Sequence, residues 1–414
     1  MLRSFVLAVF LIISLKSFPI DTQENASADS GFSFDINYRS IKLPAEIRHN
    51  LVIISMRINN SPPLNFILDT GVNTTILTEP LIANFFNFSI DQTVYVLGLG
   101  NEGIIEAGLS KNLTFNLDGI TGRNMNLVIL PEGLLSFSEI FGFPVHGIIG
   151  YDLLKEFPVM INYQRNFVRI YREPTYRVGW RSTSIPLNII NNKPYINVHV
   201  QGQQGQEIAD SLELLVDLGA TNPLFLNQSY KSLVPEFIPA YLGKGLSGHL
   251  EGKLGRLESL SFSDYTLDEP LVAFPQQEFL SVANVKHEWQ GIIGGGILSR
   301  FRVIVDYQSE KLVLRKNRSF GDPFRSNTSG IEVIVGGHEF NNFIVSYVRE
   351  NSAGYEQNIM VGDTIIGIQD ENIQEMSVED VISILNQAPG ETVELEILRS
   401  QNIYKKKLKL REDI

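Results

Sequence analysis

Short apolar segments rich in β-branched residues recur through residues 33–318. Residues 51–58 and 195–201 partly alternate between apolar and polar positions, which is typical of strands. Turn signals such as Asn59-Asn60 separate the segments. Short helices are predicted at 151–156 and 296–300. This part of the chain is therefore predicted to be mainly β structure.

An apolar run at residues 5–15 follows Arg3 and precedes Lys16 and Pro19. The run is too short to span a bilayer, and its basic start is typical of a secretory signal. We expect residues 1–19 to form a signal peptide, with the cleavage site left open, and residues 20–32 to form a linker. We therefore expect an exported protein, in the periplasm or cell envelope or secreted, without a stable membrane span after the signal is removed.

The composition narrows the functional classes. The chain has 34 Lys and Arg, 46 Asp and Glu, a net charge of −12 and no Cys. The absence of Cys excludes disulfides, thiolate metal sites and a cysteine nucleophile. The acidic balance argues against nucleic acid as a partner. An exported chain without disulfides is more typical of bacteria than of animals or fungi, so we expect a bacterial protein.

The chain also repeats itself. Residues 64–77 read LNFILDTGVNTTIL, and residues 212–226 read LELLVDLGATNPLFL. A second matching pair, around Gly150 and Gly294, follows in the same order at nearly the same offset. Collinear matches of this kind indicate two copies of one fold. We place the copies at 33–175 and 176–318.

Each copy carries an Asp followed two residues later by a Gly, and further on a pair of Ile before another Gly. The two sets are Asp69-Thr70-Gly71 with Ile148-Ile149-Gly150, and Asp217-Leu218-Gly219 with Ile292-Ile293-Gly294. This pattern resembles the lobes of the aspartic proteases, most closely the bacterial retropepsin-like proteins that carry both lobes on one chain. The resemblance implies bilobal acid-protease β barrels and a metal-free, cofactor-free endopeptidase that acts on peptides or proteins. It assigns catalysis to Asp69 and Asp217, and support of the dyad to Thr70, Gly71, Leu218 and Gly219.

The chemistry explains why two carboxylates are needed. Held close together, they cannot both ionise, so they share one proton. The ionised carboxylate takes a proton from water, and the protonated one donates to the scissile carbonyl oxygen.

Two features depart from the family pattern. Leu218 stands where a Thr normally grips the dyad, and Val72 and Ala220 follow the glycines in place of Ser or Thr. Fewer hydroxyl donors leave the carboxylates with a higher pKa, so we expect a pH optimum nearer neutral than that of stomach-type enzymes. An alternative remains open: a weak or inactive protease fold that binds peptides or serves as a scaffold.

Glycine-rich hairpins are candidates for the flaps that active family members close over the substrate, although plain tight turns explain them equally well. The flap candidates are Gly98 and Gly100 in the first copy, and Gly243 and Gly245 in the second. The segment GIIGGGILS at 291–299 superficially resembles a dinucleotide loop, but the repeat explains it better. The six histidines show no metal-ligand spacing, so no metal site is expected.

After a polar stretch at 319–330, predicted as a linker, the pattern changes. Gly362-Asp363 before the apolar segment 364–368, and a helix capped by Ser377, resemble a PDZ domain at residues 331–414. The resemblance implies a small α+β domain that binds a peptide as an added strand beside this helix, or that regulates or packs on the protease. The predicted peptide groove comprises Phe340, Phe343, Ile344, Val345, Val381 and Leu385.

Overall fold

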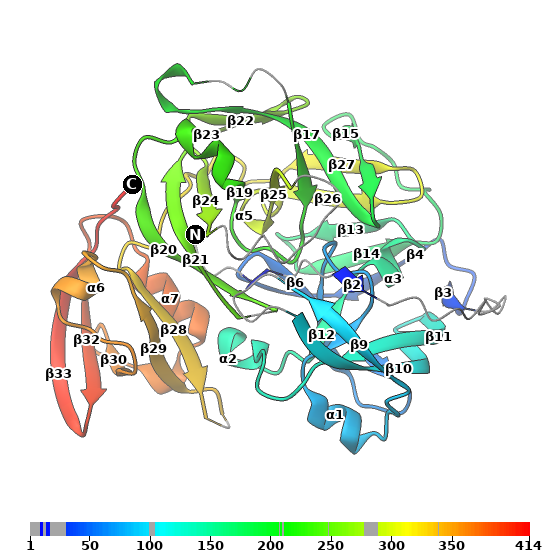
Figure 1. The fold of residues 1–414 in the computed structure, drawn as a ribbon, viewed down its shortest axis with the longest axis horizontal. Coiled ribbons are helices and arrows are strands. Elements are labelled where there is room, and N and C mark those ends of the chain that lie inside the picture. The colour runs from blue at the N-terminus through cyan, green and yellow to red at the C-terminus, as the bar shows by residue number, and fades with distance from the viewer. Residues whose placement is uncertain are drawn as a thin grey trace.

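The computed structural model describes residues 9–10, 14–16, 30–98, 104–206, 208, 211–246, 248–276, 289–337 and 339–414. Two β lobes lie against each other, and a smaller C-terminal domain packs beside them (Figure 1). The prediction of a mainly β fold is confirmed. Within the described residues, no helix is long and apolar enough to cross a membrane.

The corresponding strands follow one another in the same order in both lobes. The first lobe comprises β3 (Gly31–Phe34), β4 (Ser40–Pro44), β5 (Glu46–Arg48), β6 (Leu51–Ile58), β7 (Leu64–Leu68), β8 (Ile76–Leu77), α1 (Pro80–Phe85), β9 (Gln92–Leu97), β10 (Ile104–Leu117), β11 (Ile120–Ile129), α2 (Phe137–Phe141), β12 (Gly147–Ile149), α3 (Tyr151–Leu154), β13 (Val159–Asn162) and β14 (Phe167–Tyr171). The second lobe comprises β15 (Thr183–Pro186), β16 (Asn188–Ile190), β17 (Lys193–Gln201), η1 (Gln203–Gly205), β18 (Leu212–Val216), β19 (Leu224–Leu226), η2 (Gln228–Leu233), β20 (Ile238–Gly245), β21 (Gly248–Arg256), β22 (Ser259–Phe262), β23 (Tyr265–Asp268), β24 (Leu271–Pro275), β25 (Gly291–Ile293), α5 (Gly295–Leu298), β26 (Phe301–Asp306) and β27 (Lys311–Lys316).

The two lobes have the same strand topology. The order β9-β10-β11-β8-β12-β7-β6 in the first lobe corresponds strand for strand to β20-β21-β24-β19-β25-β18-β17 in the second. In each lobe the strand that ends before an Asp pairs in parallel with the strand that ends before the second Gly, as Leu68 with Ile149 and Val216 with Ile293. The internal repeat is therefore a repeat of structure, and it places the two Asp loops at equivalent positions.

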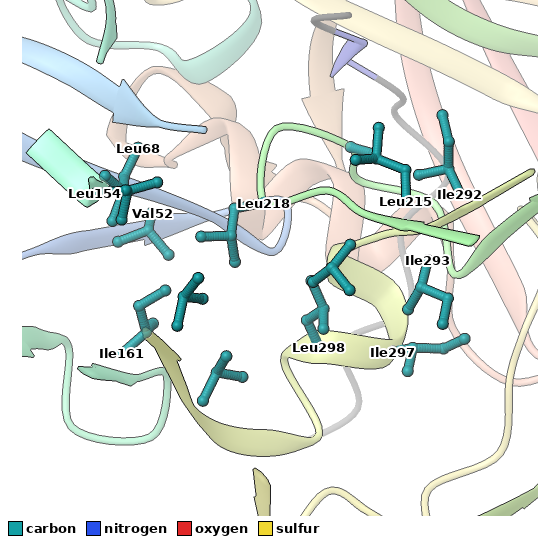
Figure 2. Close-up of a cluster of buried hydrophobic side chains, with 14 of the residues drawn as sticks. Val52, Leu68, Leu154, Ile161, Leu215, Leu218, Ile292, Ile293, Ile297 and Leu298 are labelled. Carbon is teal, nitrogen blue, oxygen red and sulfur yellow. The ribbon is translucent and has the colours of Figure 1, made fainter. Parts of the chain in front are cut away.

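A third sheet joins the lobes. Its order is β15-β27-β26-β13-β14-β4, and the central pair, β13 and β26, contributes one strand from each lobe. One continuous hydrophobic cluster also crosses the boundary. In Figure 2, Leu218 of the second lobe lies between Val52 and Leu154 of the first lobe and Leu298 of its own. The two lobes are therefore held against each other by paired strands and by apolar packing.

The C-terminal domain comprises β28 (Ile331–Gly336), β29 (Asn342–Val348), α6 (Ala353–Glu356), β30 (Thr364–Ile368), β31 (Glu371–Asn372), η3 (Ile373–Glu375), α7 (Val378–Leu385), β32 (Thr392–Arg399) and β33 (Asn402–Lys409). Its sheet has the order β28-β29-β30-β32-β33. As predicted, Ser377 caps α7, in a capping box with Asp380. Residues 326–330, predicted to lie in a linker, are buried, so they belong to this domain.

The C-terminal domain contacts both lobes. Arg48 of the first lobe pairs with Glu379 of α7 at 3.3 Å. Arg256 of the second lobe pairs with Glu412 at 2.7 Å. Glu379 lies on α7 and Glu412 lies after β33, so each lobe contacts a different part of the domain.

Two short strands near the N-terminus lie along the lobes. β1 (Val9–Phe10) pairs in parallel with β20, and β2 (Ser14–Lys16) pairs antiparallel with β9. β9 and β20 are the equivalent strands that lead into the two flap hairpins. Each hairpin is thus extended at its edge by one short strand from the N-terminal region. Removal of a signal peptide from this region stays a prediction.

Candidate active site

Backbone hydrogen bonds place the two Asp loops in matching positions. The amide of Asp69 donates to the carbonyl of Ile149 at 2.9 Å, and the amide of Asp217 donates to that of Ile293 at 2.9 Å. The glycines after these isoleucines lie directly against the loops. A Cβ atom on Gly150 would collide with the carbonyl oxygen of Asp69, so only Gly fits there. Each loop is therefore held by the strand that the repeat places beside it.

The carboxyl groups of Asp69 and Asp217 lie within hydrogen-bonding range of each other. Both side chains are fully buried, at 0% exposure. Asp69 Oδ1 accepts a hydrogen bond from the amide of Gly71 at 2.6 Å, and Asp217 Oδ1 accepts one from Gly219 at 2.8 Å. The two Oδ2 atoms receive no hydrogen bond from the described residues. The Oδ1 atoms are thus fixed, and the Oδ2 atoms remain available for chemistry.

The environment keeps a proton on this pair. Burial raises the pKa of both carboxyl groups, because the charged form loses its hydration. The negative charge of Asp217 raises the pKa of Asp69 further. The ammonium of Lys193, which our sequence analysis did not single out, lowers the pKa of both. One carboxyl is therefore protonated while the other is ionised, which is the state that acid–base catalysis on a water requires.

Thr70 supplies one half of the hydrogen bonding between the two Asp loops, which is called the grip below. Its Oγ1 donates to the carbonyl of Val216 at 2.6 Å and accepts from the amide of Leu218 at 3.0 Å. Leu218 has no hydroxyl to return these bonds, and its side chain is fully buried in the apolar cluster instead. The second half of the grip is replaced by hydrophobic contact, so the lobes remain joined at this point.

Comparisons with known proteins match two parts of the chain to family models. Residues 54–153 match the family model described as aspartyl protease, and residues 324–398 match that of the PDZ domain. The chain contains an aspartyl protease domain and a PDZ domain. Among solved structures, the aspartic proteinase from Irpex lacteus is 13% identical, with 68% of this chain and 98% of that chain covered and a TM-score of 0.42. No curated protein matches the sequence.

A further carboxylate supports the first loop of the protease domain. Asp152 Oδ2 accepts hydrogen bonds from the amide of Thr75 at 2.8 Å and from its Oγ1 at 3.0 Å. Burial raises the pKa of Asp152, although these hydrogen bonds oppose the shift. Asp152 was not among our predicted site residues. The repeat contained a signal for it, because the second copy has Gly296 at the equivalent position and so lacks this support.

Three of the four predicted flap glycines lie among the described residues. Gly98 lies against Leu246 of the other lobe, so the two hairpins meet. Gly243 and Gly245 lie on β20, and Gly245 pairs with Gly248 across the turn. Gly100 lies outside the described residues. Leu246 is fully buried in the apolar cluster of the first lobe, so the second hairpin packs against the first lobe.

Two tyrosines on the strands that lead into the hairpins differ in their surroundings. Tyr95 on β9 is 42% exposed. Tyr241 on β20 forms a hydrogen bond of 3.0 Å with His249 and stacks on Tyr347 of the PDZ domain, with the ring centroids 5.4 Å apart. The PDZ domain therefore touches the strand that leads into the second flap.

The predicted peptide groove of the PDZ domain needs correction. It placed Phe340, Phe343, Ile344 and Val345 on the ligand-binding strand, opposite Val381 and Leu385. In the structure β29, which carries Phe343 to Val345, lies inside the sheet between β28 and β30. The edge strand is β28, and α7 packs beside it. The hairpin containing Phe340 only joins these strands, so the free edge next to α7 belongs to residues 331–336.

The loop before β28 occupies the place that the prediction gave to the segment around Phe340. Gly330 has a φ of +72°, and a Cβ atom there would collide with Ser352, so the loop depends on Gly. Its amides are already bonded within the loop: that of Gly330 donates to Asn327 Oδ1 at 2.7 Å, and that of Ile331 donates to Ser329 Oγ at 3.1 Å. In PDZ domains such amides capture a chain-end carboxylate. Here side chains of the loop accept their hydrogen bonds.

The first lobe also reaches this edge. Gly142, directly after α2, lies within van der Waals reach of Val335 on β28 and Val378 on α7. Figure 1 shows α2 beside β28. The space between strand and helix, where a PDZ ligand adds, is therefore entered by the chain's own protease domain.

Proposed function

We propose that the protein is an aspartic endopeptidase with an attached PDZ domain. The observation that carries the proposal is the pair of buried carboxyl groups, Asp69 and Asp217, which equivalent loops of two repeated lobes hold within hydrogen-bonding range. Burial and mutual repulsion favour one proton on the pair at neutral and mildly acidic pH. This arrangement supports peptide-bond hydrolysis by direct attack of a water, without a covalent intermediate.

In the proposed reaction, ionised Asp217 takes a proton from the attacking water while Asp69 donates its proton to the carbonyl oxygen. The product is a tetrahedral diol. Asp217 then passes its proton to the departing nitrogen, Asp69 takes one back from a diol hydroxyl, and the C–N bond breaks. The assignment of base to Asp217 is favoured by the pKa of Asp69, which the charge of Asp217 raises further.

We propose that the substrate is an extended peptide. The support comes from β1 and β2, because an extended segment pairs with the strands of both flap hairpins. These edges accept an extended chain by strand pairing, so another extended segment in place of β1 and β2 could pair with the same backbone groups. A folded loop or a small molecule would leave these groups unpaired.

Cleavage of a diverse peptide library, followed by mass spectrometry, tests the proposal. Asp69→Asn and Asp217→Asn should each lower cleavage by at least about 100-fold and abolish binding of a hydroxyl-containing transition-state analogue. The matched control is Asp306→Asn. Asp306 is equally buried in the protease domain but bonds to Tyr176 and Ser309, so this variant should retain cleavage. Failure of the wild type to cleave any peptide would refute the proposal.

A second candidate is a protease fold that binds peptides without cleaving them. Leu218, which leaves one half of the grip unmade, favours it. In that case the transition-state analogue would bind no better than an ordinary peptide of the same sequence, and no cleavage products would form.

We further propose that the protein is exported from a bacterial cell and that its PDZ domain regulates the protease in cis. Export is supported by the basic and apolar N-terminal pattern and the absence of Cys. Regulation is supported by the contacts of β28 and α7 with Gly142 and of Tyr347 with Tyr241. The N-terminal mass of the protein recovered from a culture tests export. Cleavage rates of a peptide substrate, measured with and without added PDZ ligand peptides, test regulation.

A further inference from the structure

Lys193, the first residue of β17, is buried beside the aspartates. Only 8% of it is exposed, and a lysine is rarely buried without a partner charge. In the antiparallel pair β17 and β18, Tyr195 lies opposite Leu215. Side chains on a strand return to the same face every second residue. Lys193 precedes Tyr195 by two residues and Asp217 follows Leu215 by two, so continuing this register places Lys193 opposite Asp217 on the same face.

The first lobe has a different residue at the equivalent place. In the pair β6 and β7, Ile53 lies opposite Ile67, so the same step of two residues places Leu51 opposite Asp69. Leu51 is fully buried and apolar. The repeated framework thus presents a cation to one catalytic carboxyl group and a hydrocarbon side chain to the other.

The surroundings make this difference matter. Thr221 Oγ1, in the second Asp loop, forms no hydrogen bond within the described residues, and Val72 and Ala220 supply no hydroxyl. Lys193 forms no direct ion pair with either aspartate in the described part of the chain, so it acts through its electric field in a medium of low polarity.

The other titratable groups around the pair are phenols. Burial raises the pKa of both Tyr195 and Tyr307, so they stay neutral while the carboxyl groups titrate. Burial lowers the pKa of Lys193 to about 8, and the two carboxylates oppose that shift. The ammonium is therefore charged throughout the acidic and neutral range, in which the aspartates share their proton.

We propose that Lys193 is a positioning residue that holds the negative charge of the catalytic pair on Asp217 and leaves the shared proton on Asp69. This rests on the proposed aspartic endopeptidase function. A cation opposite one carboxyl group breaks the symmetry of a dyad built from two copies of one fold. It also stabilises the ionised state where hydroxyl donors are missing, so the pair can lose its first proton at a lower pH.

The pH dependence of kcat/KM tests this role. Without the ammonium, the first ionisation of the pair becomes harder, so the acidic limb should move to higher pH. We expect a shift of about one to two pH units for Lys193→Met, the usual effect of losing a nearby opposite charge. Lys193→Arg keeps the charge and should shift the limb by less than about 0.3 units. Lys409→Met, which removes one exposed charge from β33 of the PDZ domain, is the matched control and should leave the limb unchanged.

A second readout separates this proposal from the proposed function. Infrared difference spectra of protein with 13C-labelled aspartate follow the carboxyl groups directly, without any cleavage. If the wild type cleaves nothing, the endopeptidase proposal fails, yet the spectra still show whether Lys193→Met moves the first ionisation upward. A folded Lys193→Met protein, or Lys193→Gln if the former does not fold, that titrates within about 0.3 units of the wild type would overturn the role of Lys193.

Discussion

Leu218 offers the sharpest test of how the lobes are held together. Leu218→Thr would introduce the hydroxyl that the second half of the grip lacks, while Leu218→Val would remove similar volume without it. Thr and Val have nearly the same shape, so a comparison of the two isolates the hydroxyl. Leu218 is fully buried between the lobes. Its amide already donates a hydrogen bond to Thr70 Oγ1 at 3.0 Å.

The expected sizes follow from burial. Leu218→Val removes one methylene from a tightly packed site, which costs about 1 kcal/mol of unfolding free energy. In Leu218→Thr, a hydroxyl that mirrors Thr70 regains about 1 kcal/mol for each hydrogen bond formed, whereas a buried hydroxyl without partners costs about 1–3 kcal/mol. We expect Leu218→Thr to be about as stable as Leu218→Val or slightly more stable, and both to be less stable than the wild type.

Urea unfolding followed by tryptophan fluorescence measures these differences. The two tryptophans, Trp180 and Trp289, both lie in the protease domain, and the PDZ domain has none. The signal therefore reports on the protease lobes alone. Thr70→Val, alone and combined with Leu218→Thr, completes a double-mutant cycle in which the two grip residues should show favourable coupling.

Two outcomes would refute this reasoning. If Leu218→Thr were about 2 kcal/mol less stable than Leu218→Val, the hydroxyl would have no partners and the lobes would not mirror each other at this position. If Leu218→Thr were more stable than the wild type, the apolar packing of Leu218 would not be what replaces the missing grip.

Three further predictions concern other buried charges. Burial raises the pKa of Glu332 to about 8. Its neutral form therefore contributes folding stability that is fully present below about pH 4.5 and is lost as the pH rises through about 8. Glu332→Gln should therefore nearly equal the wild type near pH 5 and exceed it by about 4–5 kcal/mol near pH 9, as measured by hydrogen exchange of β28 in the intact chain. Asp152→Ala should lower kcat/KM about 10-fold by freeing the first Asp loop, whereas Asp152→Asn, which keeps an acceptor oxygen, should change it little; equal losses would argue against the hydrogen bonds as the cause. Arg48→Met should speed hydrogen exchange in α7 by breaking the contact with Glu379, whereas Lys405→Met, at an exposed pair, should not.

Local patterns in the sequence were sufficient to predict the repeat, the two Asp loops and the helix of the PDZ domain. An apolar run that ends in Asp and then Gly describes a strand and a tight loop, and both features depend on residues close together in the chain. The offset between Asp69 and Asp217 likewise needs no tertiary knowledge. Val381 and Leu385 could be placed on α7 because helical periodicity is also local.

Tertiary structure alone decided which side chains surround the aspartates and which PDZ strand lies at the edge. Lys193 reaches Asp217 through the register of two strands, and that register is set by the packing of the whole lobe. The loop before the edge strand β28 requires Gly330, because its φ is positive and Ser352 lies against it. Neighbours across strands and between domains are brought together by burial of apolar surface summed over many residues, so no short stretch of sequence specifies them.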